Sequence, residues 1–206
     1  MSKKVAKGLN IVFLGWIANI VLSCIALALD EKSDIRGFLP WLGYLVMLVG
    51  FWTAKEGEET FGKALGGMVA FFCFESMEML LSKASHSDEP TGGMMVMSIL
   101  GTIAYAVMIY YVCDGVLRAL YELDAPHLEK RSNTVWYIML ASTVVNILTI
   151  GLIALQAKML GGFMAVLSLI LSLVANVFFG MMLYSSSAYL SKVDDQAETE
   201  PEQKEP

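Results

Sequence analysis

Six long apolar segments, separated by short polar connectors, constrain this chain more than any other feature of its sequence. They cover residues 9–29, 37–54, 64–82, 93–113, 134–155 and 160–184. The hydrocarbon core of a bilayer is about 30 Å thick, and a helix needs roughly 20 apolar residues to cross it because each residue rises about 1.5 Å. A water-soluble domain has no need for six such runs in succession. The sequence therefore predicts an all-α integral membrane bundle of six transmembrane helices.

The composition agrees with a single membrane domain. Hydrophobic residues make up 56% of the chain and charged residues only 17%, whereas a soluble domain has about 25% charged residues. We expect this domain to cover residues 1–190. Residues 191–206 are acidic and nearly devoid of apolar side chains, so they are predicted to form a disordered cytoplasmic tail. The net charge of -6 argues against nucleic acid as a partner.

The Lys and Arg residues indicate which side of the membrane each connector faces, because cytoplasmic loops carry an excess of them. Six spans with a cytoplasmic N-terminus place Lys3, Lys4, Lys7, Lys55, Lys63, Arg118, Lys130, Arg131, Lys192 and Lys204 inside, and only Lys32, Arg36, Lys83 and Lys158 outside. We therefore predict that both termini are cytoplasmic. The third run is the least certain span because it contains Glu75 and Glu78, and its loss would invert every later segment.

The first run admits a second interpretation, a cleaved signal peptide, because Ala26-Leu27-Ala28 resembles a cleavage site. A signal core has about 7–15 apolar residues, and the run over residues 9–29 is longer. We therefore expect a retained span. The small size of the chain and its compact loops favour the plasma membrane of a bacterium, with the lipid bilayer as the surroundings of the domain.

Four polar side chains fall near the middle of the predicted spans. Asn19 lies at the midpoint of the first, Asn146 lies close to that of the fifth, and Glu75 and Asn176 lie a little beyond those of the third and sixth. A charged side chain at mid-bilayer costs about 2.5–3.5 kcal/mol on insertion scales, so it faces protein or water. We predict an intramembrane polar site formed by these four residues. The alternative is that the asparagines only hold helices together through interhelical hydrogen bonds.

Metal and cofactor sites receive little support from the sequence. Thioethers are ligands for Cu(I), and five methionines near the predicted outer face flank His86; they are Met77, Met79, Met94, Met95 and Met97. Methionine is also a flexible apolar filler, and we favour that interpretation, so no cofactor is predicted. The sequence contains no zinc-protease, serine-hydrolase or phosphate-loop motif. The chain is therefore not expected to be an enzyme.

The sequence leaves two candidate functions. The leading one is a small transporter, or the membrane component of one, with Glu75 as the coupling or binding residue. The alternative is a non-catalytic scaffold that assembles with protein partners or with itself. Gly62-x-x-x-Gly66, and Gly43 with Gly50 on one helix face, would allow close approach of helices for either purpose. A water-filled cavity reaching Glu75 would favour transport, and a dry bundle with a broad small-residue face would favour the scaffold.

Overall fold

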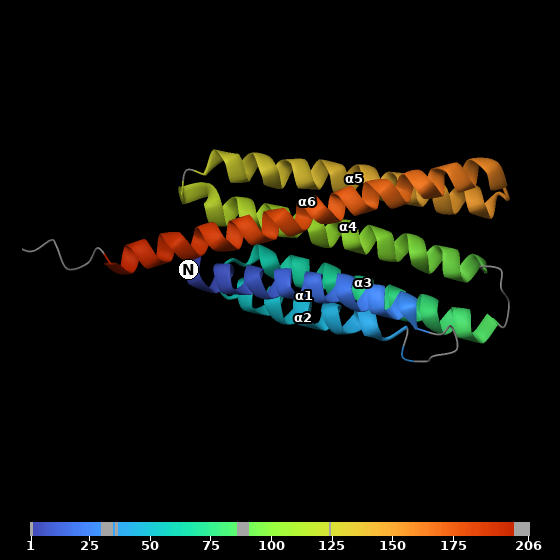
Figure 1. The fold of residues 1–206 in the computed structure, drawn as a ribbon, viewed down its shortest axis with the longest axis horizontal. Helices are drawn as coiled ribbons and strands as arrows, with labels where there is room; N and C mark the ends of the chain where they lie inside the picture. Colours follow the sequence, from blue (N-terminus) through green and yellow to red (C-terminus); the bar gives the residue numbers. More distant parts are fainter. Residues whose placement is uncertain (1, 30–34, 36, 86–90, 124, 200–206) are drawn as a thin grey trace, which may run out of the picture. The chain divides into compact units, whose positions relative to one another are not determined.

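The chain is helical throughout most of the residues that the structure describes. This structure, a computed structural model, covers residues 2–29, 35, 37–85, 91–123 and 125–199. Within these residues, six α-helices follow one another (Figure 1). They are α1 (Ser2–Ala28), α2 (Leu39–Lys55), α3 (Thr60–Ser85), α4 (Gly92–Leu120), α5 (Pro126–Ala154) and α6 (Lys158–Thr199), with a short 3₁₀ helix, η1 (Tyr121–Leu123), between α4 and α5. Each apolar run corresponds to one α-helix, which confirms the predicted helices.

Five of these helices, all except α2, are long and apolar enough to cross a membrane. With 17 residues, α2 is shorter than the usual span. Apolar side chains also cover the outside of the helices: Leu169 and Leu173 of α6 keep exposed fractions of 69% and 66%. Extensive exposed apolar surface is unfavourable in water and is accommodated by lipid. The helices thus have the character of a multi-pass membrane protein.

Local sequence explains where several helices begin. The Glu58 carboxylate accepts hydrogen bonds from the backbone N–H and the hydroxyl of Thr60, at 3.2 Å and 2.6 Å. These bonds satisfy a donor at the start of α3 that has no partner within the helix. Pro126 is the first residue of α5, and Pro40 lies in the first turn of α2. Proline is well tolerated at such positions because the N–H it lacks would have no helical partner.

The end of α5 is a tight reversal centred on Gln156. This residue has a φ of 56°, in the left-handed region that glycine usually occupies at a helix end. Its N–H donates to the Ile153 carbonyl at 3.0 Å, and the Ala157 N–H donates to the Leu152 carbonyl at 3.1 Å. This pair of bonds is the Schellman arrangement, which terminates a helix. It allows α6 to begin at Lys158.

The chain divides into two compact units. Unit 1 consists of Met1–Gly62, Asp114–Ser132 and Gly180–Pro206, and unit 2 consists of Lys63–Cys113 and Asn133–Phe179. Unit 1 therefore contains α1 and α2 together with the end of α4, the start of α5 and the end of α6. Unit 2 contains the main lengths of α3, α4, α5 and α6.

Within unit 1, α1 and α2 lie side by side and approach each other through glycines (Figure 1). A Cβ atom added at Gly15 would lie only 2.7 Å from the Met47 backbone nitrogen. Such spacing brings the two backbones into direct contact, as small residues allow in membrane helices. The same relation holds for four pairs, which are Gly8 with Ala54, Val12 with Gly50, Gly15 with Met47, and Asn19 with Gly43. The predicted face of Gly43 and Gly50 thus packs against α1.

The other predicted glycine pair does not mediate a close approach. A Cβ atom at Gly66 would meet no atom within 4 Å, and one at Gly62 would meet only the Lys55 side chain, at 3.4 Å or more. The neighbouring Gly67 is the residue of α3 that approaches α4, because its added Cβ would lie 3.0 Å from the Met108 backbone. The spacing places Gly62 and Gly66 on one face of α3, but no helix backbone approaches that face closely at these two positions.

Where the sequence predicts a disordered tail from residue 191, α6 continues as a helix to Thr199. The last part of α6 has packing partners that composition does not reveal. Leu190 is fully buried, and the Tyr189 hydroxyl donates a hydrogen bond to the Leu123 carbonyl at 3.1 Å. Burial and hydrogen bonding of this kind offset the entropy that ordering a segment costs. These contacts fix the turn that precedes the predicted tail, which is helical over residues 191–199; residues 200–206 lie outside the described residues.

Candidate functional site

One side of α4 carries three hydroxyl side chains and a glycine. Ser98, Gly101, Thr102 and Tyr105 follow the spacing i, i+3, i+4, i+7, which places them on the same side of a helix. We call these four residues the polar face of α4. Each of them meets a polar or aromatic side chain from a neighbouring helix.

Helices α5 and α6 each contribute an asparagine to this face. The Asn146 amide nitrogen donates a hydrogen bond to the Thr102 hydroxyl at 3.3 Å. The Tyr105 hydroxyl donates to the Asn176 amide oxygen at 3.3 Å, and the Asn176 amide nitrogen donates to the Ser172 carbonyl at 2.8 Å. Two of the asparagines predicted from the sequence are therefore brought to one face of α4, from different helices.

Helix α3 runs antiparallel to α4 along the same face. Three residues of α3, separated by about one turn each, meet three residues of α4 in reverse order. The ring centroids of the first pair are 5.2 Å apart, and the two residues of the last pair line the same cavity. The pairs are Phe71 with Tyr105, Glu75 with Gly101, and Glu78 with Ser98.

The Glu75 carboxyl group occupies the space that Gly101 leaves free. A Cβ atom at Gly101 would lie 3.3 Å from Glu75 Oε1, so a larger residue there would press on the carboxyl group. Glu78 lies about one turn further along α3 and lines a cavity together with Ser98 of α4. The two carboxyl groups thus lie in succession against the polar face of α4.

A cavity of about 130 Å³ lies where α3, α4 and α5 meet, and Glu78 rather than Glu75 lines it. Its lining residues are Glu78, Met94, Met95, Ser98, Ile150 and Ile153. The intramembrane site predicted from the sequence did not include Glu78. The spacing of three residues from Glu75 would have placed both carboxyl groups on one side of the helix.

Asn19, the fourth residue of the predicted site, belongs to unit 1. Its amide nitrogen donates a hydrogen bond to the Pro40 carbonyl of α2 at 2.9 Å, and it lies against Gly43 in the tight α1–α2 contact. This contact matches the alternative interpretation, in which an asparagine ties two membrane helices together.

The described residues offer oxygen groups rather than a metal centre. No group of three or more His, Cys, Asp or Glu side chains that could hold a metal ion occurs among them. Met94 and Met95 line the cavity, whereas His86, the other residue of the copper interpretation, lies outside the described residues. Carboxylates, hydroxyls and amides suit protons and hard cations, which prefer oxygen ligands.

Comparisons of this chain with protein-family models, with curated proteins and with solved structures found no match.

Proposed function

We propose that this chain is a small membrane transporter, or the membrane component of one, that moves protons or small cations along the polar face of α4. The observation that supports this function is the succession of Glu78, which lines a cavity, and Glu75, which lies against Gly101 one turn further along. Carboxyl groups are rare in membrane helices and occur mainly on ion pathways and proton relays. In this mechanism Glu78 exchanges the ion with the cavity, and Glu75 is the coupling residue.

The groups beyond Glu75 continue the path in the proposal. Thr102 and Tyr105 carry hydroxyls that are already hydrogen bonded to Asn146 and Asn176. Hydroxyls both donate and accept hydrogen bonds, so they can pass a proton or coordinate a cation that leaves Glu75.

The proposed topology has six spans, with both termini in the cytoplasm of a bacterial cell. The excess of Lys and Arg in the connectors assigned to the inside supports this orientation. The contact of α2 with α1 supports the assignment of α2 as a span in addition to the five longer helices. Close packing against a long apolar helix can hold a short one across the bilayer.

Proteoliposomes test this function directly. Purified protein is reconstituted with a pH-sensitive dye inside the vesicles, and proton entry is followed after an inside-negative potential is imposed; Na⁺ and K⁺ fluxes are measured in the same way. We expect the wild type to carry at least one of these ions and Glu75→Gln to abolish the flux. Glu129→Gln, a carboxyl group outside the site, is the matched control. Equal fluxes in the wild type and Glu75→Gln, or none above those of empty vesicles, would contradict the proposal.

A scaffold remains the second candidate, and the open glycines of unit 2 favour it. Cβ atoms added at Gly66, Gly151 or Gly162 would meet no atom within 4 Å. Such bare helix surface can accept another helix at close range. If self-association is the function, Gly66→Leu should reduce the dimer fraction in lipid nanodiscs, and the ion fluxes described above should be absent.

A further inference from the structure

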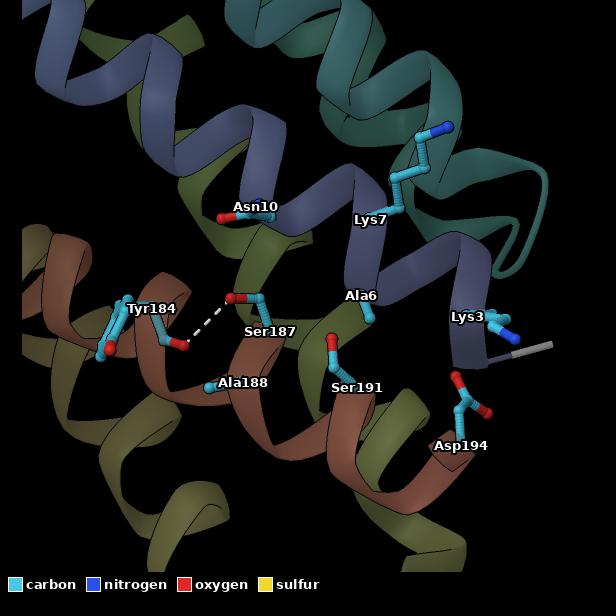
Figure 2. Close-up of a pocket in the computed structure, with 9 residues that line it drawn as sticks. All are labelled: Lys3, Ala6, Lys7, Asn10, Tyr184, Ser187, Ala188, Ser191 and Asp194. Carbon is cyan, nitrogen blue, oxygen red and sulfur yellow. Dashed lines mark hydrogen bonds between the residues drawn. The ribbon is translucent and has the colours of Figure 1, made fainter. Parts of the chain in front are cut away.

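A second and larger cavity lies in unit 1, between the first turns of α1 and the last turns of α6 (Figure 2). Its volume is about 530 Å³. Each helix presents one side to it, because the lining residues recur at intervals of three and four. They are Lys3, Ala6, Lys7 and Asn10 from α1, and Tyr184, Ser187, Ala188, Ser191 and Asp194 from α6.

The position of this cavity along both helices places it at a membrane surface. Its α1 residues precede or only just enter the first apolar run, and its α6 residues begin at the last residue of the final run, Tyr184, and continue beyond it. The aromatic rings of Phe13 and Tyr184, with centroids 5.5 Å apart, mark the boundary where the apolar part begins. Aromatic residues are enriched at that boundary in membrane proteins. The cavity is therefore located at the depth of lipid headgroups.

The lining of the cavity is suited to an anion. Two ammonium groups, Lys3 and Lys7, outnumber the single carboxyl group, Asp194. The cavity also lies beside the start of α1, where the helix dipole adds partial positive charge. Figure 2 shows Lys3 and Asp194 at the same end of the cavity, with the Ser191 hydroxyl directed toward α1. The net positive charge and the hydroxyl donors match the groups that bind phosphate oxygens.

The side chains that line the cavity differ in what they can offer to a phosphate group. The Ser187 hydroxyl donates its hydrogen bond to the Tyr184 carbonyl at 3.0 Å. Ser187 can therefore accept a hydrogen bond from a ligand but not donate one while this bond is kept. The Lys7 ammonium group points away from α6 in Figure 2, and its methylene stem reaches the cavity. Lysine is a flexible point charge, so rotation about its side-chain bonds can bring this group over the cavity. Lys7 and Ser191 are the donors on which binding should depend most.

We propose that the cavity between Lys7 of α1 and Ser191 of α6 binds a phosphate group at the membrane surface. A phospholipid headgroup and a soluble phosphoester share this chemistry. The site lies in unit 1, so it is separate from the carboxyl groups of the proposed ion path in unit 2. Its existence does not depend on whether the chain transports an ion.

Binding is measured by calorimetry on the full chain in detergent with four probes: inorganic phosphate, glycerol 3-phosphate, dioctanoyl phosphatidylglycerol and dioctanoylglycerol. Binding of phosphatidylglycerol alone supports the proposal with a lipid as the source. Binding of inorganic phosphate or glycerol 3-phosphate as well supports it with a soluble source. If no phosphate probe binds, or if dioctanoylglycerol binds as tightly as phosphatidylglycerol, the proposal is wrong.

Variants locate the site. Lys7→Gln and Ser191→Ala should each weaken phosphate binding, the former about tenfold, as expected for loss of one charge-assisted hydrogen bond. Lys7→Arg should retain it. The matched control is Lys192→Gln, which removes the same charge next to Ser191 from a residue that does not line the cavity. Equal weakening by Lys192→Gln would show a general effect of charge and would overturn the assignment. Ser191→Ala removes only one oxygen atom, so the phosphate affinity of this variant tests the proposal if Lys7→Gln is unstable.

Discussion

Gly101 leaves free the space that the Glu75 carboxyl group occupies, since a Cβ atom there would lie 3.3 Å from Glu75 Oε1. A methyl group needs only a small displacement of the carboxyl group, but a longer side chain would push it off the polar face of α4. We expect Gly101→Ala to reduce the proteoliposome ion flux moderately and Gly101→Leu to reduce it at least tenfold. Gly151→Leu is the control, because its added Cβ would meet no atom within 4 Å. Full flux in Gly101→Leu would argue against a role for this contact.

The contact between α1 and α2 should be highly sensitive to side-chain size. In Gly15→Leu the new side chain would have to fit within a few ångströms of the Met47 backbone, and backbone atoms cannot rotate away. Overpacking in a well-packed interior costs roughly 1–3 kcal/mol, and we expect a loss at or above that range. Thermal unfolding in detergent measures it. Gly162→Leu, at an open position, should change the melting temperature little; a similar fall there would show that the loss is not specific to the helix contact.

The turn between α5 and α6 offers a stabilising substitution. Gln156 has a φ of 56°, which costs a residue with a Cβ atom about 1–2 kcal/mol relative to glycine. Gln156→Gly should therefore raise the free energy of unfolding by about 1 kcal/mol. Gln156→Val should lower it, because a β-branched residue tolerates this conformation least. A destabilising Gln156→Gly would mean that the glutamine side chain has a role in the turn.

The ion pair between Lys4 and Glu56, 2.9 Å apart, makes a pH-dependent contribution to unit 1. The hydrogen bond and positive charge of Lys4 hold the pKa of Glu56 below its ordinary value of 4.5. The folded state therefore favours the ionised form, so this contribution is present above pH 4.5 and is lost as the pH falls through the lowered pKa. The difference in melting temperature between the wild type and Glu56→Gln should be constant near neutral pH and disappear in stronger acid. The effect should be small because both side chains are exposed. A difference that grows on acidification would contradict this prediction.

Cysteine labelling tests the six-span topology, and the structure identifies suitable positions. Thr60 and Ser132 belong to predicted cytoplasmic connectors but are buried, so exposed neighbours are better sites. In a chain without its three native cysteines, cysteines at Glu59 and Lys130 should react with an impermeant reagent only after permeabilisation. Those at Thr91 and Gln156 should react in intact cells. External labelling at Lys130 would rule out the proposed orientation.

The six helices could be predicted from the sequence because membrane crossing imposes a length and a composition on each one. The end of α6 could not. Its residues after Leu190 are polar and acidic, and composition alone gives such a segment no reason to order. This segment continues a helix whose preceding turn is fixed by a contact far away in the sequence, the bond from Tyr189 to Leu123. Tertiary contacts of this kind leave no local pattern.

The depth of the candidate-site residues in the membrane could be predicted from the sequence, but the side of the helix on which each of them lies could not. Counting along a span locates Glu75, Asn146 and Asn176 near mid-membrane, but it does not say which side of its helix each residue occupies. The structure brings these three into unit 2 and leaves Asn19 in unit 1. The polar face of α4 was missed because one of its four members is a glycine, whose contribution is the space that it leaves to its neighbour.

The short length of α2 has a consequence for the membrane in which this protein resides. Its 17 residues extend about 26 Å, which is less than the hydrocarbon thickness of about 30 Å. The glycine contacts with α1 prevent α2 from sliding or tilting independently to make up a difference. If α2 crosses as proposed, the lipids beside it must compress, and the energetic cost rises with bilayer thickness. The protein should therefore partition preferentially into thin, short-chain bilayers.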